Sequence, residues 1–295
     1  MEGFRQSLRH FANATDIDPG YALAYAGMAD SYALLASRGQ PADESAPKAK
    51  AAAVRALEMD EALAEAHASL GYIKSWLEWD WPGAEAEYRR AIELDPNCAT
   101  ARHWFGEYLV LMGRFDEGFR ELELARRADP LSVIISLDLG KMHFFARQPD
   151  LAIEQLRKTL EMEPQFSTGW LFLAMAYNSK GMREEAMAIL RKEIERDGKE
   201  RTIFKSVLGY FHAVSGRAEE ARAVLEELKS RGAPAFEIAL VHAGLGQREQ
   251  ALDWLEEAYA RRDPFLIYIK VDPNLDGLRP DPRFQNLLRR VGLGQ

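Results

Sequence analysis

The chain has 295 residues, of which 47% are hydrophobic and 28% are charged, a balance typical of a folded protein and not of a disordered one. Its 38 basic and 46 acidic residues give a net charge of −8, which argues against binding nucleic acid or an anionic membrane, because both require a concentrated basic surface. No apolar run approaches the roughly 18 residues of a membrane span, and a single cysteine, Cys98, excludes an internal disulfide framework and a multi-cysteine zinc site.

The first predicted element is a helix within residues 1–20, in the stretch "GFRQSLRHFANATDIDPG". It closes with the same acid-proline turn that closes later helical hairpins, so we interpret it as the second helix of a hairpin whose first helix is missing. Half a hairpin leaves an apolar face uncovered. We therefore expect the chain to have been cut from a longer one.

Residues 21–262 are predicted to repeat a helical hairpin about seven times. Acid-proline closures recur at equal spacing, at Pro96, Pro130 and Pro164. Each interval between closures is long enough for two helices, because it contains two successive apolar stripes at helical spacing.

The fifth unit shows the pattern of one hairpin most clearly. Trp170, Leu173 and Tyr177 lie on one helical face, Gly181 breaks that helix, and Ala186 begins the apolar stripe of a second helix. Small residues on the facing sides let two helix axes approach to about 8–10 Å.

Three units depart from this pattern. The first carries an insertion at residues 37–48, "SRGQPADESAPK", and the second holds one extra residue in its "WLEWDW" turn. In the third unit Gly118 stands at the position where alanine is usual.

Residues 263–295 leave the period, and we expect them to cap the last hairpin. Asp281 is a good N-cap with Pro282 in the first turn of a short helix. One apolar face of that helix is formed by Phe284, Leu287, Leu288 and Val291. The preceding apolar run Phe265–Val271 fits either a strand or buried packing on the seventh unit, and the packing interpretation is favoured.

The helical hairpins resemble tetratricopeptide (TPR) repeats, whose period is about 34 residues, with small residues, glycine and proline at the consensus positions. The resemblance implies an all-α fold, an α-solenoid in which antiparallel hairpins form a right-handed superhelix. The insertion, "GYIKSWLEWDWPGAEAEYRRAIELDPN", "ATARHWFGEYL" and the tail "VDPNLDGLRPDPRFQNLLRR" also look like the C-terminal TPR region of bacterial multidomain signalling proteins. In those proteins the N-terminal part is a winged-helix transcription regulator, a serine/threonine kinase or a nucleotide cyclase.

In a TPR array the first helices of the hairpins line a concave groove, and positions two, five, nine and twelve of each first helix share one face. Many of these positions are apolar or aromatic here, which is typical of a binding surface. Neighbouring helices or the chain's own insertion could equally fill them, and we favour partner binding. The predicted groove residues are Tyr72, Trp76, His103, Glu107, Leu137, Lys141, Phe144, Leu171, Met175, Asn178 and Tyr210.

Catalytic sequence patterns are absent: there is no HExxH, Walker glycine loop, GxSxG or CxxC. His143, His212 and His242 fall near the eleventh position of their units, where packing between helices is a better interpretation than metal ligation. We therefore predict no catalytic residue, no cofactor and no metal. The lysine–asparagine pair by which chaperone-binding TPR domains hold a C-terminal carboxylate is also missing from the fifth and ninth positions.

These observations predict a non-enzymatic scaffold that binds a peptide or partner segment in the concave groove, as part of a larger bacterial signalling or regulatory protein. The alternative is a ligand-responsive or dimerising sensory domain that controls an attached effector. We expect a protein or peptide partner, with self-association possible, and no nucleic acid or membrane binding by this segment. We expect a cytoplasmic location, or a periplasmic one if a membrane span lies upstream.

Overall fold

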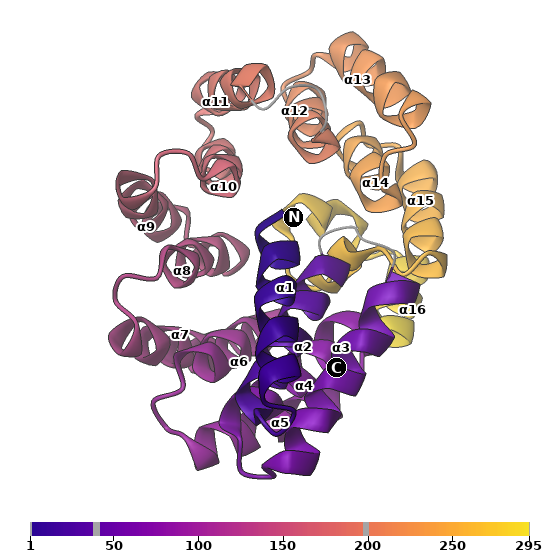
Figure 1. Ribbon diagram of the computed structural model, residues 1–295. Coiled ribbons are helices and arrows are strands. Elements are labelled where there is room, and N and C mark those ends of the chain that lie inside the picture. Colours follow the sequence, from indigo (N-terminus) through magenta and orange to yellow (C-terminus); the bar gives the residue numbers. More distant parts are fainter. Residues whose placement is uncertain (1, 38–41, 197–200, 295) are drawn as a thin grey trace. The chain divides into compact units, whose positions relative to one another are not determined.

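The computed structural model describes residues 2–37, 42–196 and 201–294, and every regular element in these ranges is a helix (Figure 1). The chain divides into two compact units, Met1–Leu131 (unit 1) and Ser132–Gln295 (unit 2). Each unit is built from successive antiparallel helical hairpins, so the predicted all-α solenoid is confirmed. None of the described helices is long and apolar enough to cross a membrane.

Unit 1 starts with α1 (Glu2–Ile17), which lies against the first hairpin; the Phe11 ring would be only 2.3 Å from a Cβ added at Gly27. Three hairpins follow, α2/α3, α4/α5 and α6/α7. Their helices are Ala22–Ala36 (α2), Ala42–Met59 (α3), Ala64–Tyr72 (α4), Trp81–Leu94 (α5), Ala99–Leu111 (α6) and Phe115–Ala128 (α7). Of the insertion predicted at residues 37–48, residues 38–41 lie outside the described residues, and from Ala42 onward it forms the start of α3.

The extra residue predicted for the "WLEWDW" turn is accommodated in a helix and not in the turn. The α4 helix continues as a π-helical segment, η1 (Ile73–Glu78), and a π turn holds one more residue than an α turn. Trp79 then takes a left-handed conformation with φ 60°. Asp80 caps the start of α5 by accepting a hydrogen bond from the Gly83 amide at 3.0 Å.

The backbones of α6 and α7 approach closely at two glycines, Gly106 and Gly118. A Cβ added at Gly118 would lie 2.9 Å from the Gly106 carbonyl oxygen, and one added at Gly106 would lie 3.0 Å from the Gly118 carbonyl oxygen. The distance at Gly118 is shorter than real Cβ atoms show against backbone, and the distance at Gly106 is tighter than nearly all such contacts. Glycine therefore replaces the usual alanine at 118 because the two backbones are in contact.

Unit 2 contains four hairpins, α8/α9, α10/α11, α12/α13 and α14/α15, followed by a C-terminal segment (Figure 1). Their helices are Val133–Phe145 (α8), Pro149–Met162 (α9), Ser167–Ser179 (α10), Arg183–Arg196 (α11), Thr202–Val214 (α12), Ala218–Ser230 (α13), Ala235–Gly244 (α14) and Arg248–Ala260 (α15). In the α10/α11 hairpin the small residues Ala174 and Ala186 are fully buried, as close packing of the two helices requires.

A left-handed residue follows the first helix of the hairpin in six of the described hairpins. These residues are Trp79, Gly113, Arg147, Gly181, Gly216 and Gly246. The first four are equally spaced, one repeat period apart, so the sequence period is repeated in the backbone conformation. Glycine adopts this conformation freely, whereas other residues do so at a cost of about 1–2 kcal/mol. Trp79 and Arg147 are therefore the exceptions within the series.

The C-terminal segment contains two 3₁₀ helices, η2 (Pro264–Tyr268) and η3 (Pro273–Leu278), and then α16 (Pro282–Val291). The apolar run from Phe265 is 3₁₀-helical and not a strand, and most of its aliphatic side chains are buried. As predicted, the Asp281 carboxylate caps α16, accepting from the Arg283 amide at 2.9 Å, and the predicted apolar face of α16 is buried.

Candidate functional site

Within unit 1 two predicted groove residues meet in an aromatic stack. The Trp76 ring, on η1, stacks on the Tyr72 ring at the end of α4, with centroids 5.1 Å apart and planes 9° apart. The Trp104 ring on α6 also packs on Tyr72, with centroids 4.7 Å apart and planes tilted by 47°. Tyr72 and Trp104 are buried, whereas Trp76 keeps part of its surface exposed. The cluster is therefore fixed by its buried members and presents the Trp76 ring.

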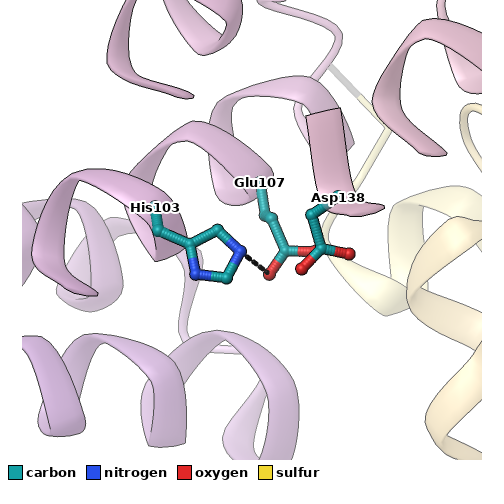
Figure 2. A group of neighbouring side chains, drawn as sticks. All are labelled: His103, Glu107 and Asp138. Atoms are coloured by element: carbon teal, nitrogen blue, oxygen red, sulfur yellow. Dashed lines mark ion pairs between the residues drawn. The ribbon is translucent and has the colours of Figure 1, made fainter. Parts of the chain in front are cut away.

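The other two predicted residues of unit 1 are neighbours on α6. His103 and Glu107 are four residues apart, so their side chains lie on one helical face, and His103 Nε2 is 3.8 Å from Glu107 Oε2 (Figure 2). Both side chains are buried. Asp138, also labelled in Figure 2, belongs to α8 of unit 2, where its carboxylate is 2.5 Å from Lys141 Nζ.

On α8 of unit 2 the structure places Leu137, Lys141 and Phe144 in buried positions. Leu137 points toward α10, since its Cδ1 would be 3.8 Å from a Cβ added at Gly169. The Phe144 ring contacts Phe172 of α10, with centroids 6.0 Å apart. Lys141 Nζ lies 5.8 Å from the centre of the Tyr268 ring, in the C-terminal segment.

The remaining predicted residues are on α10 and α12. Leu171 and Met175 are buried, whereas Asn178 and Tyr210 keep part of their surface exposed. Burial raises the pKa of Tyr210 to about 12, and the charges of Asp272 and Asp276 act in the same direction. Tyr210 therefore lies within the electrostatic reach of the C-terminal segment.

Most of the predicted groove residues are thus packed inside the protein and do not form an exposed strip. The exceptions are Trp76, Asn178 and Tyr210, which are partly exposed. Part of the packing in unit 2 comes from neighbouring first helices and part from the C-terminal segment. A sequence pattern identifies which face a side chain occupies, but it does not show what covers that face.

Sequence reasoning missed the residues that bind the C-terminal segment to α8, which are Phe145, Arg147, Tyr268 and Asp276. One signal could have identified Arg147. It stands one repeat period after Gly113 and one before Gly181, at a position where the repeat uses glycine. A bulky residue at such a position needs a compensating interaction.

Of the three histidines predicted to pack between helices, His212 and His242 are buried, whereas His143 keeps part of its surface exposed. His212 is buried, and burial together with the charges of Arg191 and Arg217 lowers its pKa. His242 is buried as well, burial lowers its pKa, and its Nδ1 lies 2.6 Å from Gln247 Oε1. A group held neutral in this way packs without the cost of burying a charge.

Comparison with known proteins agrees with this architecture. Residues 137–201 match the tetratricopeptide repeat family. The chain is therefore an all-α solenoid, the class that its successive helical hairpins define.

Solved structures with this fold come from several proteins. The APC/C hetero-tetramer Cut9-Hcn1 matches with a TM-score of 0.67 at 17% identity, over 98% of this chain and 52% of the matched one, so this chain spans about half of that protein's length. A tetratricopeptide repeat protein from Parabacteroides merdae matches with a TM-score of 0.62 at 13% identity, covering 90% of this chain and 99% of the other. PilW, a type IV pilus biogenesis factor, matches with a TM-score of 0.56 at 22% identity, covering 69% and 93%. At these identities the likeness concerns the fold.

Proposed function

We propose that this protein is a non-enzymatic interaction module that binds a segment of a partner protein on the first helices of its hairpins. In unit 1 the contact is centred on Trp76. The observation that carries the proposal is the aromatic stack, in which a partly exposed Trp76 ring rests on the buried Tyr72. Large aromatic side chains held rigidly in this way supply much of the binding energy at protein interfaces.

The fold supports the same proposal. Stacked TPR hairpins present extended surfaces without a reactive centre, and they act by holding partners. One matched chain of this fold comes from a solved hetero-tetramer, the APC/C complex Cut9-Hcn1. We further propose that the module works in the cytoplasm, within a larger bacterial signalling or regulatory protein, which rests on the resemblance of its repeats and tail to such proteins.

The proposal can be tested without knowing the partner. A random peptide library displayed on phage is selected against the immobilised chain, and the enriched peptides are synthesised and measured by fluorescence anisotropy. Binding is compared between the wild type, Trp76→Ala and a matched control, Val54→Ala, which removes an exposed apolar side chain from α3, a second helix of the same unit. Circular dichroism confirms that both variants are folded.

We expect Trp76→Ala to weaken binding by about tenfold or more, which corresponds to about 1.4 kcal/mol or more. Val54→Ala should bind as the wild type does. Peptides that bind Trp76→Ala and the wild type equally would show that the first-helix face of unit 1 is not the binding surface.

A further inference from the structure

In unit 2 a segment after the last hairpin contacts the first helix of the first hairpin. After α15 the chain forms η2 and η3, and residues 264–280, which we call the C-terminal strap, reach back to α8. The hydrogen bonds that join the two regions span 124 and 129 residues of sequence. The strap follows the last hairpin of unit 2 and contacts the first hairpin of the same unit.

Hydrogen bonds of Asp263, just after α15, hold the start of the strap against α14. The Asp263 carboxylate accepts hydrogen bonds from the Phe236 amide at 3.1 Å and from the Phe265 amide at 3.0 Å, so it joins the start of α14 to the start of η2. Leu266 and Ile267 are fully buried. This first part of the strap belongs to the core of unit 2.

The middle of the strap places an aromatic ring on α8. Tyr268 stacks on Phe145, with centroids 4.8 Å apart and planes 17° apart. Lys141 Nζ lies 5.8 Å from the same ring, within reach of a cation–π interaction. The Tyr268 side chain thus occupies a site formed by a ring and an ammonium group of α8.

Arg147, directly after α8, holds the next part of the strap. Its guanidinium group donates to Asp276 Oδ1 at 2.6 Å and to the Val271 carbonyl oxygen at 3.4 Å. Arg147 is left-handed, with φ 59°, at the position where the repeat normally has glycine. The guanidinium contacts give a reason for keeping arginine at a position where its backbone is strained.

The ion pair at the end of the strap is half-exposed, unlike the apolar residues before it. The Arg147 and Asp276 side chains are 45% and 46% exposed, whereas Tyr268 is 8% exposed. Exposed ion pairs contribute little to stability. Three apolar residues that lie between Tyr268 and Asp276 are also buried, namely Ile269, Val271 and Leu275. The Arg147–Asp276 ion pair is therefore the contact between the strap and the α8 region that opens at the least cost.

We propose that the α8 surface formed by Lys141, Phe145 and Arg147 is a docking site for a partner segment that carries an aromatic residue followed, eight positions later, by a carboxylate. In the isolated chain the strap, through Tyr268 and Asp276, fills this site and competes with the partner. The inference rests on the proposed function, since it extends partner binding to unit 2 and names the chemistry of the partner.

Competition follows from the covalent connection. A segment tied to its own site acts at an effective concentration in the millimolar range, so a partner in solution binds only to the fraction of molecules in which the strap has left. Weakening the strap should therefore strengthen binding in trans. Weakening the site should abolish it.

The probe is a fluorescein-labelled synthetic peptide of residues 265–279, "FLIYIKVDPNLDGLR". The control peptide carries Tyr268→Ala and Asp276→Asn. Three full-length proteins are titrated by fluorescence anisotropy: the wild type, Tyr268→Ala/Asp276→Asn, and the same double variant with Arg147→Gly added.

We expect the double variant to bind the probe at least tenfold more tightly than the wild type and to discriminate against the control peptide. Adding Arg147→Gly should return binding to the wild-type level or below. Equal binding by wild type and double variant would overturn competition by the strap. No binding by the double variant, or no discrimination between the two peptides, would overturn the docking site.

A milder variant keeps the test decisive if the double variant does not fold. Asp276→Asn alone removes only the partly exposed ion pairs of Asp276 with Arg147 and with Arg279. It should bind the probe about threefold or more tightly than the wild type, with faster hydrogen exchange at residues 270–278. Unchanged binding and exchange would contradict the inference.

The peptide titration and the phage selection test the two proposals separately. The peptide titration depends on α8 and the strap in unit 2, whereas the phage selection is judged by Trp76→Ala in unit 1. Failure of the titration with a positive Trp76 result removes only the strap inference. Failure of the Trp76 test with a positive titration moves the binding surface to unit 2.

Discussion

The first helices of the two units share a repeat pattern but have different surroundings. In unit 1 the aromatic cluster on α4, η1 and α6 leaves Trp76 partly exposed. In unit 2 the aromatic and basic residues of α8 contact Tyr268 of the C-terminal strap. The comparison shows that a repeated pattern gives equivalent positions on equivalent helices, while non-repeated segments decide whether those positions can reach a partner.

The backbone contact between α6 and α7 in unit 1 should give the largest mutational effect. Gly118→Ala in unit 1 places a Cβ 2.9 Å from the Gly106 carbonyl oxygen. We expect it to lower the free energy of unfolding by about 3 kcal/mol, because backbone must shift to admit the methyl group.

The matched change in unit 2 is at Ala152, which stands one repeat period after Gly118 and is fully buried. Ala152→Gly should cost about 2 kcal/mol, because glycine has the lower helix propensity and a buried methyl group is lost. Urea denaturation of both variants measures the effects. Equal destabilisation would mean that the two hairpins are packed alike.

Removal of the stacked tyrosine should give the next largest effect, confined to unit 2. Tyr268→Ala deletes a ring that is 8% exposed and stacked on Phe145. We expect a loss of about 2–3 kcal/mol, below the roughly 3–5 kcal/mol of a fully buried aromatic residue. Hydrogen exchange followed by mass spectrometry should show faster exchange in α8 and the strap, with α4 and α6 unchanged.

Each unit contains a carboxyl group with a raised pKa, and both make the protein less stable as pH rises. Burial raises the pKa of Glu237 in unit 2 to about 8, and the charge of Asp263 adds to this. In unit 1 burial raises the pKa of Asp30 to about 7, although the Ser69 hydroxyl donates to its Oδ1. A carboxyl group with a raised pKa in the folded state binds its proton there while the unfolded chain has lost it, so folding is favoured at low pH.

The contribution of Glu237 should fall between pH 4.5, its ordinary pKa, and about 8, and that of Asp30 between 3.8 and about 7. The slope is at most about 1.4 kcal/mol per pH unit for one group. It should be smaller for Asp30, because its side chain keeps partial contact with solvent. Urea midpoints measured from pH 5 to 9 should flatten in Glu237→Gln up to about pH 8 and in Asp30→Asn up to about pH 7. Unchanged profiles in either variant would contradict the assignment.

The smallest effect on stability is expected at Arg147, the left-handed residue that follows α8. Arg147→Gly relieves a strain of about 1–2 kcal/mol but loses a half-exposed ion pair worth about 1 kcal/mol or less, so global stability should change by less than about 1 kcal/mol. The local effect should be larger, with faster amide exchange around Asp276. A variant with unchanged exchange there would show that Arg147 does not hold the strap.

Much of the fold could be predicted from the sequence because helical hairpins are specified locally. Gly181 ends a helix where the pattern predicts, and Asp281 caps the last helix with the expected hydrogen bond. The extra residue near Trp79 was recognised but assigned to the turn, since the sequence does not distinguish a longer turn from a π-helical end to α4. Local chemistry determines that a helix must end, and packing determines how it ends.

The candidate site was less predictable. The periodicity places Lys141 and Phe144 on the inner face of a first helix, and they lie on α8 as expected. It gives no information about Tyr268, which comes from a segment outside the repeat and contacts α8 from far along the chain. The role of Arg147 could be noticed only as a departure from glycine.

The sequence by itself determined the repeat, the helices and the faces that their side chains occupy, because constant repeat spacing, helix-breaking residues and apolar stripes act over one or two helical turns. Tertiary structure alone decided which of those faces are covered. That depends on non-local contacts, such as Tyr268 on Phe145 and Asp276 on Arg147, whose free energy arises only when distant segments meet.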